Sequence, residues 1–327
     1  MSYGYGSNQL THYSEPALTF AEQLARVQAG GIKVQDPAKA LQALASVSYY
    51  RLKVYWHPFL PQNNANAPGD ASAADGSFEQ ALALYEFDRQ LRLLVMDVLE
   101  RFEVLIRTAV TYHIGHSYGA MGHERPENFH PSFEHKKWIK HLHGETARSR
   151  DPAIRDFKFK YSQDFPVLPI WMVSELISLG SMSRLYWGML HEDKRAIATP
   201  FRVHHKRLAN WLHVLTYVRN VGAHHGRLWN RNLAIQPKAM KSLLEWQAPV
   251  TPRTDRIFYV LLMLRHLMRG QEKLDDWAKQ CEMLLSPVVA MPRWRIEMGF
   301  PENWAQHPIW TGVVSSLSLF NRPPTGD

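Results

Sequence analysis

A continuous helical pattern over residues 78–118 constrains the fold of this chain more than any other feature. Apolar residues recur there at spacings of three and four, which places their side chains on one face of an α-helix. The pattern consists of Leu84, Phe87, Leu91, Leu94, Val95, Val98, Phe102, Leu105 and Ile106. More helical patterns follow and no pair of strands is evident, so we predict an all-α fold.

Start and stop signals place the other helices. Asp36 followed by Pro37 predicts a capped helix start, whereas residues 61–76 (PQNNANAPGDASAADG) have no periodic apolar face and predict a linker. The other expected helices cover about residues 14–30, 36–51, 134–148, 170–179, 184–190, 201–226, 256–269 and 272–285. We therefore expect a flexible tail (1–13), an N-terminal helical element (14–60), a polar linker (61–76), a helical core (77–290), and a C-terminal extension and tail (291–327).

Composition excludes several classes of protein. Cys281 is the only cysteine among the 327 residues, so the chain can form neither an intramolecular disulfide nor a cysteine-based zinc site. The N-terminus lacks the basic and apolar regions of a secretion signal, and no apolar run approaches the ~20 residues that span a bilayer. We expect a cytoplasmic protein without membrane contact. The net charge of +8 favours polyanionic partners such as RNA.

Residues 201–226 form the helix that we expect to carry the chemistry. Its core face should contain Leu208, Trp211, Leu215, Val218 and Gly222, because a helix turns about 100° per residue. A second stripe beside that face lies within about 40° by the same geometry. It contains the hydrogen-bonding residues His213, Tyr217, Asn220 and His224.

Arg219 and His224 are the candidate catalytic pair, with Asn220 between them. RNA cleavage through the 2′-OH needs groups that transfer protons and a positive charge on the phosphate. Histidine transfers protons near neutral pH, and the arginine fork matches two phosphate oxygens. Asn220 could orient the histidine or the phosphate. The nucleophile belongs to the substrate, so this chemistry requires no metal and no cofactor.

The residues after this pair are basic and aromatic. His225, Arg227, Trp229 and Arg231 could grip an RNA backbone and stack one base. The alternative for Trp229 is that it fills the core behind the helix.

Charged residues elsewhere have two interpretations. Glu175 lies within an apolar helix and is either paired or able to orient Arg219 or His224. Glu103 and Arg107 suit a structural ion pair at i and i+4. Asp88 could pair locally, and Arg92 could reach RNA.

The adjacent pairs His204–His205 and His224–His225 do not predict a metal site, because neighbouring residues on a helix point about 100° apart. We expect none.

Four stretches resemble the Abi-like (AbiD/AbiF) abortive-infection family, and the resemblance covers roughly residues 15–312. The most specific is YVRNVGAHHGRLWNR at residues 217–231. The others are SYYRLKVYWHPF at residues 48–59, LYEFDRQLRLLVMDVLERFEVLIR at 84–107 and MGFPENWAQHPIW at 298–310.

This resemblance implies membership of the HEPN superfamily, whose hallmark of arginine, a polar residue and a later histidine matches Arg219, Asn220 and His224. It implies a HEPN-like helical bundle with helical extensions at both ends. It also implies a metal-independent endoribonuclease that leaves a 2′,3′-cyclic phosphate and a 5′-OH. The family further implies a homodimer, a role in phage defence or as a toxin, and a small non-coding RNA or an antitoxin as partner. The alternative is a catalytically inactive HEPN module that binds RNA or regulates a partner.

Overall fold

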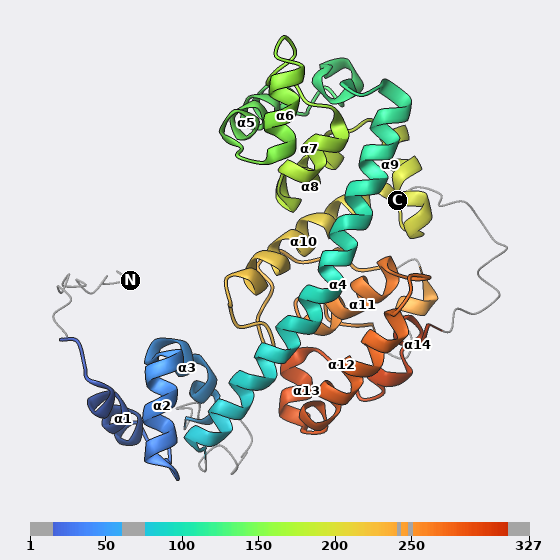
Figure 1. Ribbon diagram of the computed structural model, residues 1–327. Helices are drawn as coiled ribbons and strands as arrows, with labels where there is room; N and C mark the ends of the chain where they lie inside the picture. The colour runs from blue at the N-terminus through green and yellow to red at the C-terminus, as the bar shows by residue number, and fades with distance from the viewer. Residues whose placement is uncertain (1–15, 61–75, 241–242, 248–250, 313–327) are drawn as a thin grey trace, which may run out of the picture. The chain divides into compact units, whose positions relative to one another are not determined.

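The computed structural model describes residues 16–60, 76–240, 243–247 and 251–312 (Figure 1). Within these residues the chain forms 14 α-helices and no strand, which confirms the all-α fold class. The predicted tail over 1–13, and almost all of the linker over 61–76, lie outside the described residues. The described chain divides into two compact units, and the division falls after Phe87, inside the long helix.

The first unit shows how local capping sets helix bounds. Asp36 accepts a hydrogen bond from the Lys39 N–H at 2.9 Å, as its capping role predicts. The first helix begins later than residue 14 because a capping box formed by Thr19 and Glu22 starts it. The expected helix 36–51 is broken at Ser48, whose φ is 79°. The helices of this unit are α1 (Phe20–Ala29), α2 (Pro37–Val47), α3 (Tyr49–Trp56) and the first residues of α4 (Phe78–Tyr118).

The predicted long helix is confirmed as α4. It has 41 residues, which corresponds to about 62 Å at 1.5 Å per residue. Its apolar residues are buried along its length, including Leu91, Phe102 and Ile106, each at 0% exposure. Such a stripe stabilises the helix by packing rather than by propensity.

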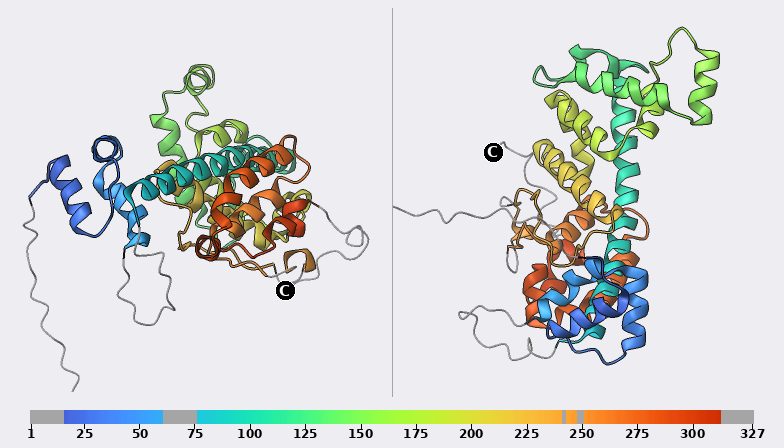
Figure 2. Two further views of the ribbon diagram at one scale, coloured as in Figure 1. Left: turned by 90° about the horizontal axis from the view of Figure 1, so that it is seen from below. Right: turned by 90° about the vertical axis from the view of Figure 1, so that its left-hand side faces the viewer.

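The second unit contains the remaining helices. Figures 1 and 2 show α5–α8 gathered around the C-terminal end of α4 and α11–α14 along its middle. Neither α6 nor α9 was predicted, because both are short and polar. The helices are α5 (His135–Arg148), α6 (Pro152–Lys160), α7 (Ile170–Leu176), α8 (Leu179–Gly188), α9 (His191–Ala198), α10 (His205–Ala223), α11 (Ile257–Leu267), α12 (Leu274–Val289), α13 (Pro292–Met298) and α14 (Pro308–Thr311).

Helix α11 forms the centre of this unit. Every one of its residues is buried, including Arg265 and His266, as expected for a helix that is apolar all round. The buried Arg265 donates from Nη2 to the Asp275 carboxylate at 2.6 Å. No helix in the described parts of the chain is long and apolar enough to cross a membrane.

Buried histidines should make the fold sensitive to acid. Burial lowers the pKa of His266 to about 3 and the pKa of His307 to about 4, whereas an unfolded histidine has a pKa of about 6.5. Between these values the unfolded chain binds protons that the folded chain does not. Stability is therefore lost as the pH falls below about 6.5.

We predict that lowering the pH from 7 to 5 decreases the free energy of unfolding by about 3–4 kcal/mol, measured by urea titration. Carboxylates contribute less in this range because most stay ionised. A His307→Gln variant should show a shallower dependence. An unfolding free energy that is constant over this pH range would contradict the prediction.

Candidate functional site

The C-terminal end of α10 positions the candidate site. The helix ends at Ala223 rather than at 226, and His224 occupies its C-cap. His225 adopts the left-handed conformation with a φ of 56°. The Gly226 N–H then donates to the Val221 carbonyl at 2.8 Å, so the chain leaves the helix through a Schellman-type turn. The His224 side chain is exposed at this exit.

The start of α10 also differs from the prediction. Arg202 is left-handed with a φ of 54°, so the helix cannot extend back to residue 201. His204 caps the helix instead and accepts a hydrogen bond from the Lys206 N–H at 3.4 Å.

Arg219 is held between an amide and a carboxylate. Its Nη1 donates to the Asn220 Oδ1 at 3.3 Å, and its Nε lies 3.7 Å from the Glu103 Oε2. About one third of the Arg219 side chain is exposed (34%), compared with 15% for Glu103. The guanidinium is therefore oriented by neighbours and still accessible to an anion.

Glu103 links this arginine to the rest of the unit. It also forms the predicted ion pair with Arg107 on α4, and the Arg107 Nη1 donates to the Ile177 carbonyl at 2.7 Å. Sequence reasoning predicted the Glu103–Arg107 pair and missed the contact with Arg219. A partly buried acid on the polar edge of a long helix was the signal that a second cation lay nearby.

The arrangement brings a cation, an amide and an imidazole to one end of a helix. Asn220 and His224 lie about 40° apart around the axis and Arg219 lies on the other side of Asn220. The helical stripe from the sequence continues to His213, which is exposed, and to Tyr217, which is half-buried. Such a set can bind an oxyanion and transfer a proton beside it.

Glu175 lies elsewhere on the surface. It is exposed on α7, and its Oε1 lies 3.5 Å from the Ser174 hydroxyl. Its proposed role in orienting the pair stays a prediction, and the carboxylate in contact with Arg219 is that of Glu103.

A buried carboxylate anchors the segment that follows His224. Asp88 is 0% exposed and accepts hydrogen bonds from the Leu228 N–H at 3.1 Å and the Trp229 N–H at 2.7 Å. It also pairs with Arg92 on the next turn of α4. The predicted local pairing of Asp88 is confirmed, but the prediction that Arg92 reaches RNA is wrong, because this side chain is buried at 5% exposure.

Close packing brings α10 against α4. A Cβ atom added at Gly222 would lie 2.7 Å from the Met96 sulfur, closer than van der Waals contact allows. The predicted position of Gly222 on the core face is confirmed.

The basic segment after the helix is only partly available to a ligand. Trp229 is 0% exposed and packs edge-to-face against Trp294 with ring centroids 5.1 Å apart, so the prediction that it stacks on a base is wrong and the core alternative holds. His225 is exposed, whereas Arg227 and Arg231 are half-buried. The Arg231 Nε donates to the Arg227 carbonyl at 2.6 Å, which stabilises the turn.

Among the described residues, no group of three or more His, Cys, Asp and Glu side chains is placed to hold a metal ion. Comparison with known proteins identifies the family. The family model described as Abi-like protein matches residues 42–230, more than half of the chain. The chain belongs to the Abi-like protein family. The matched region of this Abi-like protein contains Arg219, Asn220 and His224 and ends next to Trp229. No curated protein and no solved structure matches the chain.

Proposed function

We propose that this Abi-like protein is a metal-independent endoribonuclease of the HEPN type with Arg219, Asn220 and His224 as its catalytic residues. The observation that carries the proposal is the exposed His224 at the exit of α10, one turn after an accessible Arg219 that Asn220 and Glu103 orient. Family membership suggests a role in abortive infection, a form of phage defence. A toxin-like RNase suits that role.

The proposed reaction uses the RNA 2′-OH as nucleophile. The 2′-oxygen forms a bond to the adjacent phosphorus, and the bond from phosphorus to the 5′-oxygen breaks. One imidazole accepts the proton of the 2′-OH, and a second donates a proton to the 5′-oxygen. Arg219 stabilises the charge on the phosphate oxygens. The products are a 2′,3′-cyclic phosphate and a 5′-OH.

The need for both an acid and a base favours a homodimer. Two copies of the chain would supply two His224 side chains and two Arg219 side chains to one composite cleft. Sedimentation should give a dimer for the active species, and an active monomer would remove this part of the proposal.

The function is tested with purified protein and several RNAs at neutral pH in excess EDTA. Cleavage that persists in EDTA and leaves cyclic phosphate ends supports the proposal. RNA that stays intact in all substrates contradicts it. Intact RNA that is nevertheless bound would identify the alternative, an inactive RNA-binding module.

Glu103 provides a test of how Arg219 is oriented. A Glu103→Gln variant removes a partly screened charge from Arg219, worth about 1 kcal/mol, so RNA should bind about fivefold more weakly. Binding is measured on uncut RNA in a His224→Ala background.

The matched control is Glu100→Gln, an exposed acid one turn earlier on α4, which should leave the affinity unchanged. If Glu103 acts through Arg219, then Glu103→Gln has no further effect once Arg219 is replaced by Ala. An equal loss in both backgrounds would show that Glu103 acts only through the fold.

A further inference from the structure

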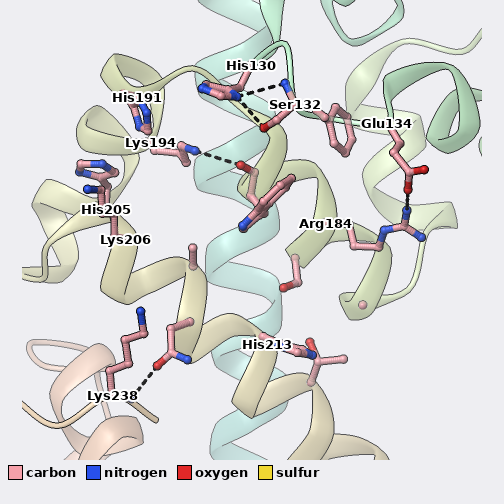
Figure 3. Close-up of a pocket in the computed structure, with 17 residues that line it drawn as sticks. His130, Ser132, Glu134, Arg184, His191, Lys194, His205, Lys206, His213 and Lys238 are labelled. Atoms are coloured by element: carbon pink, nitrogen blue, oxygen red, sulfur yellow. Dashed lines mark hydrogen bonds and ion pairs between the residues drawn. The ribbon is translucent and has the colours of Figure 1, made fainter. Parts of the chain in front are cut away.

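A large cleft lies beside α10, in the part of the second unit that α8, α9 and the segment before α5 also line (Figure 3). Its volume is about 1090 Å³, above the ~300–1,000 Å³ range of small-molecule pockets. We call it the histidine cleft, because His130, His191, His205 and His213 line it.

One end of the histidine cleft is strongly basic. The rings of His130 and His191 lie 5.3 Å apart, and those of His191 and His205 lie 5.5 Å apart. Lys194 stands beside them and donates from Nζ to the Trp187 carbonyl at 2.9 Å; Lys206 completes the group (Figure 3). His191 and His205 are also the first residues of α9 and α10, so both helix dipoles add positive potential.

Little negative charge balances this end. Of the residues that line the cleft, Glu134 is the acidic one. It lies 3.9 Å from Arg184 on the other wall and 3.5 Å from Lys137. The nearby Asp193 carboxylate accepts a hydrogen bond from Tyr118 and contacts His113. The neighbouring charge of Lys194 lowers the pKa of His191, which reflects crowded positive charge.

His205 lacks the partners that a buried polar group needs. Its side chain is buried (6% exposed), and among the described residues neither ring nitrogen has a hydrogen-bond partner. Buried polar atoms are nearly always paired. A ring N–H that faces a basic cleft is suited to an anionic oxygen.

The histidine cleft continues along α10 toward the candidate site. Lys206, Asn210 and His213 line it, and Asn220 continues the same helical stripe by its spacing. The 14 residues from Lys206 to Asn220 correspond to about 21 Å of helix. An exposed aromatic side chain, Trp187 at 53% exposure, also lines the cleft. Cations that follow a groove together with an exposed aromatic ring are typical of single-stranded RNA binding.

We propose that the histidine cleft binds single-stranded RNA, with one backbone phosphate at His130, His191 and His205 and one base on Trp187. The strand continues along α10 to Arg219 and Asn220, and this last step alone rests on the proposed nuclease function.

The test measures the affinity of the full chain for a short fluorescent single-stranded RNA, with His224→Ala present to prevent cutting. Lys206→Glu should weaken binding by more than tenfold and reduce the salt dependence by about 0.7 per lost phosphate contact. Trp187→Ala should weaken it by about tenfold, the effect of losing one stacked base.

The matched control is Lys140→Glu, which reverses the same charge at an exposed position of α5 outside the cleft. It should change the affinity less than twofold. Equal weakening by Lys206→Glu and Lys140→Glu would reduce the effect to net charge and overturn the proposal. Wild-type affinity in both Lys206→Glu and Trp187→Ala would also overturn it.

Two further outcomes separate this inference from the nuclease proposal. If the wild-type protein cuts RNA through His224 while the cleft variants bind normally, the cleft proposal fails alone. If nothing is cut but the cleft variants lose binding, the nuclease proposal fails alone. Tight binding of AMP or inorganic phosphate without binding of the RNA strand would show a small-molecule site and overturn the proposal.

Discussion

His224→Ala is expected to lower the rate of RNA cleavage by about 10²–10⁴-fold, the range that general acid–base catalysis contributes. The fold should survive, because the imidazole is exposed and the His224 N–H still donates to the Asn220 carbonyl at 3.0 Å. An exposed substitution of this kind changes stability by about 0.5 kcal/mol or less. Cleavage is followed on a labelled RNA under single-turnover conditions, and unfolding is followed by circular dichroism.

His141→Ala serves as the control because it removes another exposed histidine, on α5, and should cut at the wild-type rate. The substituted protein should still bind RNA, since Arg219 and Asn220 stay in place. Cleavage by His224→Ala within threefold of wild type would exclude this imidazole as the acid or the base. Loss of both cleavage and RNA binding would indicate that the variant had lost its structure instead.

The helices follow from the sequence wherever a long apolar stripe determines them. The pattern over residues 78–118 predicted α4 correctly because a stripe of buried side chains defines it. Helix ends depend on single residues instead. Ser48, Arg202 and His225 adopt positive φ without being glycine, and no sequence pattern predicts a break there. These positions explain why the N-terminal helix divides in two and why α10 is shorter than expected.

The candidate site was predictable at its centre and less so around it. Arg219 and His224 are accessible, as a catalytic pair must be. Their surroundings depend on tertiary contacts between residues far apart in the chain, such as Glu103 with Arg219 and Asp88 with Trp229. Composition could not separate a stacking tryptophan from a core tryptophan at position 229, because both occur after a helix. The histidine cleft likewise joins segments that have no local sequence signal.

Asp88→Ala is expected to destabilise the protein by about 3–5 kcal/mol, because removing one partner of a buried ion pair leaves charge without compensation. Asp88 is 0% exposed, and its partner Arg92 is 5% exposed. The variant also removes the acceptor for two backbone N–H groups, those of Leu228 and Trp229. These hydrogen bonds tie the segment after His224 to α4. Urea unfolding followed by tryptophan fluorescence measures the loss.

The same helix offers a matched control in Asp97 and Arg101, another Asp–Arg pair at i and i+4, with side chains 46% and 38% exposed. Asp97→Ala should cost less than about 1 kcal/mol, because water screens an exposed pair. Asp88→Asn keeps an oxygen for one backbone N–H and removes the charge, so its loss should fall between the two. If Asp88→Ala and Asp97→Ala destabilise equally, burial does not govern the Asp88–Arg92 pair, and the segment that leads away from His224 has another anchor.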